Sequence, residues 1–176
     1  MDYRSYYPLP LRWLSNAVDF SLAVFGISIV SLVFINATLR GAAGLDLAWS
    51  LEVTAFFLLW STFLGCAAAI ARGAHMRVSE IAESLFPDTF RHWLSILINL
   101  VIAVMLISLI VTGYSISSHT WAQRTTVLYW PVGFLYASMP AGMLVSLIFH
   151  GFNSIHDLKH PDLFSGKDDQ PDAGAA

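Results

Sequence analysis

The chain has 176 residues, of which 56% are hydrophobic and 12% are charged, and its formal net charge is −3. Because soluble domains carry about 25% charged residues, this composition excludes an ordinary soluble domain. A slightly acidic chain also lacks the basic surface of nucleic-acid-binding proteins, so we expect no nucleic-acid partner. The single cysteine, Cys66, excludes an intrachain disulfide and a cysteine-based zinc site.

The apolar residues are concentrated in four long blocks. The first covers residues 18–39 and is longer than the apolar region of a signal peptide, about 7–15 residues, so we interpret it as a retained helix. The second covers 49–70, the third 93–114 and the fourth about 127–149. About twenty residues at 1.5 Å each cross the hydrocarbon layer of a bilayer. The sequence therefore predicts an all-α integral membrane protein with four transmembrane helices.

Two prolines, Pro131 and Pro140, fall inside the fourth block, and we expect both to kink its helix. Residues 1–152 would then form the membrane domain. Residues 153–176 are polar, and we expect them to be a disordered cytoplasmic tail.

A short amphipathic helix is predicted over residues 78–86, between the second and third blocks. Val78, Ile81 and Leu85 recur there at helical spacing, Ser79 can cap the helix, and Pro87 would end it. Its polar face is acidic, whereas surface helices that bind anionic lipid are usually basic. We therefore expect its apolar face to pack on protein at the cytoplasmic side.

The basic residues predict the orientation. Of the nine lysines and arginines, only Arg40 and Arg124 lie in the loops after the first and third blocks. The other seven lie in the N-terminal segment, the loop after the second block and the tail. The positive-inside rule places those seven, and both termini, in the cytoplasm, so residues 40–48 and 115–126 should face the periplasm.

Glu52 is the first candidate for chemistry. A carboxylate in a membrane span indicates a functional site by default, because burying a charge in lipid is costly. Glu52, however, is only one turn into the second block, near Trp49, where it can reach water or a cation. We favour a structural ion pair with Arg40 at the outer interface over an ion-coupling site.

The histidines are the second candidate. Haem held between helices needs histidines that face one another inside the bundle. His75, His92 and His150 fall near the cytoplasmic edge, His119 lies outside the spans, and no span carries a charge near its centre. We therefore expect no catalytic, cofactor or metal residues and no enzyme activity, and we interpret the chain as a subunit that supports another protein.

Rows of small residues indicate close helix packing. Gly65 and Ala69 form one row on the second block, and Gly133, Ala137 and Ala141 form another on the fourth. Such rows let membrane helices approach closely.

Two combined motifs are more specific than any of these features alone. They are FLG-x₆-RG-x-H-x₂-V, starting at Phe63, and L-x₂-P-x₄-Y-x₃-P-x-G, starting at Leu128. With the four-helix layout, they resemble the small membrane subunit of tripartite ATP-independent periplasmic (TRAP) transporters over about residues 10–152. The structural and interface candidates that this resemblance selects are Arg40, Trp49, Glu52, Gly65, Arg72, His75, Pro131, Tyr136, Pro140 and Gly142.

The resemblance implies a partner system in a bacterial inner membrane. In that family a large membrane subunit carries an organic acid and sodium in an elevator motion, and a soluble periplasmic protein delivers the substrate. The small subunit flanks the large one, so no cofactor is expected in this chain and sodium coupling is expected in the large subunit. The alternatives are a haem- or quinone-associated membrane anchor and a self-contained small multidrug-type transporter, and the latter requires a carboxylate at mid-depth.

Overall fold

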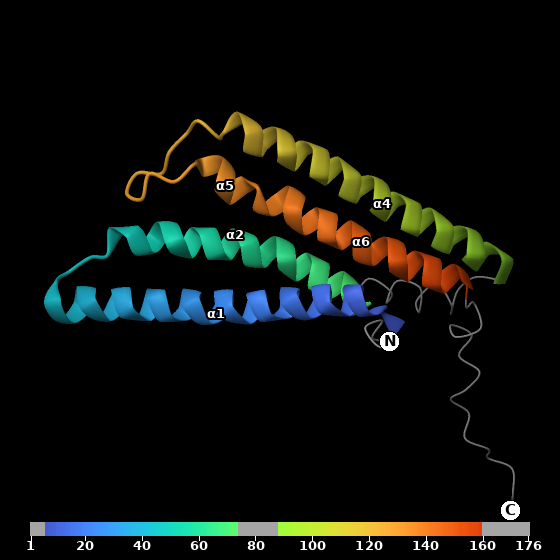
Figure 1. Ribbon diagram of the computed structural model, residues 1–176, viewed down its shortest axis with the longest axis horizontal. Coiled ribbons are helices and arrows are strands. Elements are labelled where there is room, and N and C mark those ends of the chain that lie inside the picture. Colours follow the sequence, from blue (N-terminus) through green and yellow to red (C-terminus); the bar gives the residue numbers. More distant parts are fainter. Residues whose placement is uncertain (1–5, 74–87, 160–176) are drawn as a thin grey trace, which may run out of the picture.

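The computed structural model describes residues 6–73 and 88–159, whose regular elements are helices (Figure 1). The amphipathic helix expected over 78–86, the histidine at position 75 and the tail from 160 onward lie outside the described residues. The helices are α1 (Leu9–Ala43), α2 (Ala48–Ala71), α4 (Asp88–His119), α5 (Val132–Tyr136) and α6 (Ser138–Lys159).

The four predicted spans are confirmed as helices that are long and apolar enough to cross a membrane. The helices extend beyond the apolar blocks. Pro8 is the N-cap of α1 and Pro10 lies in its first turn, where a missing N–H breaks no helical hydrogen bond, so α1 begins at Leu9 and not near residue 18. At the other end, α6 continues to Lys159.

The predicted start of the fourth helix is wrong. Residues 127–130 are not helical, Pro131 is the N-cap of α5, and Tyr129 has a φ of 56°. A proline disfavours helical backbone in the residue before it, so Trp130 cannot continue a helix into Pro131. Pro140 does lie at an interruption, since it falls in the first turn of α6 and cannot donate to the carbonyl of Tyr136.

The helices form one open layer and not a closed bundle. Contacts run in the order α1, α2, α6, α4, and α5 lies against α4 (Figure 1). The start of α1 and the end of α6 lie at one end of the layer. In the most apolar window of each span, only 6% of the residues are buried in α1 and 11% in α4 at the edges of the layer, against 17% in α2 and 33% in the span from Val132 to His156. Most of the apolar surface therefore faces lipid or another protein.

The core lies where α2 and α6 cross near the end of the layer that holds the N-terminus. Its buried members are Tyr7, Ala67, Ile70, Ala71, Leu106, Met143 and Phe149. The Tyr7 and Phe149 rings stack with centroids 5.6 Å apart, which ties the segment before α1 to α6.

Candidate functional site

The carboxylate of Glu52 holds the loop between α4 and α5. Glu52 Oε1 accepts hydrogen bonds from Thr126 Oγ1 at 3.0 Å and from the backbone N–H of Val127 at 2.8 Å. Oε2 accepts one from the backbone N–H of Leu128 at 2.8 Å. Hydrogen bonds to an ionised acceptor are stronger than neutral ones. We call this set of contacts the Glu52 clasp; it joins the first turns of α2 to a loop more than seventy residues away.

The clasp replaces the ion pair predicted between Glu52 and Arg40. Within the described residues no ion pair joins these two side chains, and Arg40 is exposed in the last turn of α1. Backbone N–H groups satisfy the carboxylate because residues 126–128 are not helical and leave those donors available. Glu52 thus has the structural role that the sequence favoured, with a different partner.

The loop of residues 120–131, which we call the clasped loop, is also braced internally. The N–H of Thr125 donates to the Trp130 carbonyl at 2.9 Å, and the N–H of Trp130 donates to Thr125 Oγ1 at 3.0 Å. The N–H of Val132 donates to the Gln123 carbonyl at 2.9 Å. Tyr129 lies between these bonds with its positive φ, which non-glycine residues seldom adopt.

An aromatic cluster lies next to the clasped loop. Phe56 of α2 stacks on Phe134 of α5 with centroids 5.1 Å apart and meets the edge of Trp130 at 5.9 Å. Trp60, one turn further along α2, lies 6.1 Å from Phe134. The cluster and the Glu52 clasp therefore act together to hold the loop and α5 against α2.

A second polar junction closes the opposite end of the layer. Asn153 of α6 accepts a hydrogen bond from the Tyr7 hydroxyl at 2.9 Å, and its amide donates to the Ile70 carbonyl at 3.0 Å. His150 Nε2 lies 3.0 Å from the backbone oxygen of Asn99 in α4. This junction joins α2, α4, α6 and the segment before α1.

Arg72, a motif residue, forms an ion pair that sequence reasoning missed. It ends α2, and its Nη2 lies 3.0 Å from Asp19 Oδ1 on α1. The arginine side chain is 55% exposed, so the pair contributes little to stability.

The small residues differ in what they contact. A Cβ added at Gly142 would lie 2.6 Å from Phe63 Cβ and 2.8 Å from its backbone carbon, so α2 and α6 touch there. Gly133 packs as closely against Ser117 near the end of α4 and Trp121 of the clasped loop, and Ser117 Oγ donates to the Gly133 carbonyl at 2.8 Å. A Cβ at Gly65 would meet nothing within 4 Å. In the part of the chain that the structure describes, the space beside Gly65 is therefore open.

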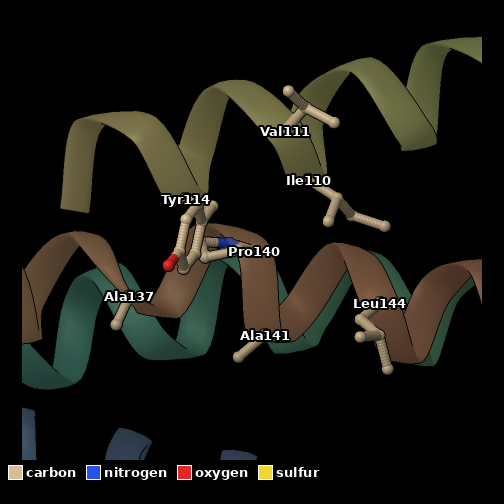
Figure 2. A pocket seen from close by; sticks show the side chains of 7 residues that line it. All are labelled: Ile110, Val111, Tyr114, Ala137, Pro140, Ala141 and Leu144. Carbon is tan, nitrogen blue, oxygen red and sulfur yellow. The ribbon is translucent and has the colours of Figure 1, made fainter. Parts of the chain in front are cut away.

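An apolar groove runs between α4 and α6. It measures about 450 Å³, and Tyr114 leans across it from α4 toward Pro140 (Figure 2). Ala137 and Ala141, members of the predicted small-residue row, leave the space that forms the groove. Its lining is Ile110, Val111, Tyr114, Ala137, Pro140, Ala141 and Leu144.

The remaining predicted residues lie on the surface. Trp49 is 40% exposed at the start of α2, and Tyr136 is 41% exposed at the end of α5. In residues 6–73 and 88–159, no group of three or more His, Cys, Asp and Glu side chains could hold a metal ion.

The residues that sequence reasoning missed are those that bond to backbone groups. Asn36 is one, since its Oδ1 accepts a hydrogen bond from the backbone N–H of Leu47 at the start of α2, at 2.9 Å. Asn153 is another. A side-chain amide at the edge of an apolar block could have indicated these contacts, because a buried amide usually has a hydrogen-bond partner.

The sequence of the chain is similar to those of small subunits of TRAP transporters. Residues 29–160 match the family described as tripartite ATP-independent periplasmic transporters, DctQ component. The chain is 28% identical over 131 residues to the ectoine TRAP transporter small permease protein TeaB of Halomonas elongata, covering 73% of this chain and 67% of that protein. It is 25% identical over 145 residues to a protein of Haemophilus influenzae assigned to the TRAP transporter small permease proteins, covering 78% and 88%.

Proposed function

The chain belongs to the DctQ component family of TRAP transporters, and we propose that it scaffolds a large, sodium-coupled transport subunit in the bacterial inner membrane. That subunit would take up an organic acid delivered by a periplasmic binding protein. The family is a transporter component and not an enzyme family, and the chain is a multi-pass membrane protein.

The open layer is the observation that carries this proposal. A self-contained transporter encloses a polar pathway between its helices. In this chain α1 and α4 lie at the edges of a single layer, and most of the surface of each is uncovered. The strong polar contacts lie at the two ends of the layer, in the Glu52 clasp and around Asn153. Moving a charged solute through lipid requires compensating groups at mid-depth. Such a chain is suited to holding a neighbour and not to carrying a solute.

The family membership favours this role over the two alternatives drawn from the sequence. A haem or quinone anchor and a small multidrug-type transporter both require a site inside the helices, and no observation on the described residues favours either. One relative is named for ectoine, but this chain has no residue that we would assign to substrate choice. We assign that choice to the large subunit and the binding protein.

Co-purification with the large subunit in mild detergent tests the scaffold role. Gly65 belongs to the family-like motif and faces open space among the described residues, so Gly65→Leu should reduce the amount of large subunit recovered. Gly26 on α1 also faces open space but lies outside the motif, so Gly26→Leu is the matched control and should leave recovery unchanged. If the wild-type chain recovers no large subunit, the scaffold role is wrong.

The orientation proposed for the complex has its own test. The Glu52 clasp places the loops after α1 and α4 at the same end of the layer, which agrees with both facing the periplasm. In a Cys66→Ser background, an impermeant thiol reagent should label a cysteine at Ala43 and not one at Ser84 when only the outer membrane is permeable. The reverse pattern would overturn the orientation.

A further inference from the structure

We propose that the clasped loop, residues 120–131, is a membrane-interface anchor whose partner is the lipid headgroup layer on its side of the bilayer. The inference requires only that the helices span a membrane, so it stands apart from the transport role. It rests on the depth at which the loop is held, its exposed side chains and the hydrogen bonding of its backbone.

The Glu52 clasp fixes the depth of the loop. Glu52 lies four residues after the start of α2 at Ala48, which is about 6 Å along the helix axis. The backbone of Val127 and Leu128 bonds directly to its carboxylate. Residues 127 and 128 of the loop therefore lie level with the first turns of a spanning helix, and the loop extends past the ends of α4 and α5 (Figure 1). The headgroup layer on each side of a bilayer is about 5–7 Å thick, which matches this depth.

The end of α4 gives the same depth independently. The apolar block that predicts the third span ends at residue 114, and α4 continues to His119 before the loop begins. Five residues of helix rise about 7.5 Å. The loop therefore begins about one headgroup thickness from the hydrocarbon boundary.

The side chains that the loop exposes are suited to this layer. Tyr129 is 71% exposed, Trp121 52%, Val127 43% and Trp130 36%. Tryptophan and tyrosine favour the interface because each has an apolar ring and a polar group. Arg124 is the only charged residue of the loop. Exposed Trp and Tyr rings at the depth of the headgroup layer meet lipid directly, so lipid is the occupant that we propose.

Much of the loop backbone has hydrogen-bond partners within the protein and does not depend on water for them. The N–H groups of Thr125, Val127, Leu128, Trp130 and Val132 all donate to protein acceptors. Non-helical backbone is tolerated at the membrane only where such groups are satisfied by the protein. The bonds on both sides of Tyr129 also hold it at its unfavourable φ of 56°, which keeps its ring on the outside.

Spin-label accessibility tests the anchor on the full-length chain in vesicles of phosphatidylcholine and phosphatidylglycerol. Single cysteines at Tyr129 and Val127, in a Cys66→Ser background, would carry the label. Ile27, exposed on α1, gives the hydrocarbon reference, and Asp46, exposed in the loop before α2, gives the aqueous one. For each label, the measured quantity is the ratio of its collision rate with oxygen to its collision rate with a water-soluble nickel complex. We expect this ratio to be higher for the labels at 129 and 127 than for the label at 46. If they match the label at 46, or are shielded from both reagents, the proposal is wrong.

A conservative variant separates the ring of Tyr129 from its backbone role. Asparagine adopts positive φ more readily than tyrosine, so Tyr129→Asn keeps the turn and removes the ring. The label at Val127 should then shift severalfold toward the nickel complex if the ring anchors the loop. An unchanged ratio would show that the ring does not anchor the loop and would overturn this part of the proposal.

Discussion

The contact between Gly142 of α6 and Phe63 of α2 can be tested with one methyl group. In Gly142→Ala, the new Cβ would lie 2.6 Å from Phe63 Cβ, 2.8 Å from its carbonyl carbon and 2.9 Å from its oxygen. Two of these atoms are backbone, so no rotamer change can relieve the clash. Ordinary contacts begin at 3.4 Å, and the helices must therefore separate by up to about 0.8 Å.

The expected magnitude follows from two opposing effects. Overpacking of this kind costs about 1–3 kcal/mol, and replacing glycine by alanine in a helix returns up to about 1 kcal/mol. Gly142→Ala should therefore lower the free energy of unfolding by about 1–2 kcal/mol. Gly65→Ala is the matched control, because its Cβ meets nothing within 4 Å, and it should raise stability by up to about 1 kcal/mol.

Thermal unfolding in detergent, followed by the loss of monodisperse protein on size exclusion, measures the difference. Gly142→Ala and Gly65→Ala should differ by about 1–3 kcal/mol, which for a chain of this size is a gap in Tm of roughly 2–12 °C. Equal Tm values for the two variants would mean that α2 and α6 do not meet at Gly142, and the order of helices in the layer would have to be revised.

Two further predictions concern the ends of the layer. Glu52→Gln replaces one carboxylate oxygen by a donor, so it should open the Glu52 clasp, loosen the loop and raise the rate at which trypsin cleaves after the exposed Arg124. Asp46→Asn on the neighbouring exposed loop should not raise that rate, and equal cleavage rates in the two variants would argue against the clasp. Tyr7→Phe and Asn153→Ala should each destabilise the chain, by about 1 kcal/mol and about 2 kcal/mol, because the first removes one hydrogen bond and the second removes two. The double variant should cost less than the sum by about 0.5 kcal/mol or more in the same melting assay, and strict additivity would mean that the two side chains do not interact.

The sequence predicts the four spans well because the signal for a spanning helix is simple. Length and absence of charge suffice over residues 49–70, where α2 begins and ends within one residue of the apolar block. The signal is weaker where apolar residues are not helical. Hydropathy predicts that a helix begins at Val127. Pro131, however, disfavours helical backbone at Trp130, and the Glu52 carboxylate accepts hydrogen bonds from backbone N–H groups of a non-helical loop.

The partners of polar side chains could not be predicted in the same way. Opposite charges at similar depth suggested Arg40 for Glu52, yet the carboxylate bonds to backbone N–H groups, which every residue has and no sequence pattern marks. Asp19 and Arg72 are likewise far apart in the chain, and only the packing of α1 on α2 brings them together. Gly142 differs from Gly65 for the same reason, since close approach depends on the neighbouring helix.

Sodium-driven uptake into proteoliposomes tests the scaffold role most directly. The solute would be the one that the periplasmic binding protein holds when purified, in radiolabelled form. Vesicles with this chain alone should show no uptake, vesicles with the large subunit and the binding protein should show little, and vesicles with all three should transport. A cross-link from this chain to the fixed domain of the large subunit should leave that rate largely intact. Uptake by the chain alone, or loss of transport on cross-linking, would contradict a static scaffold.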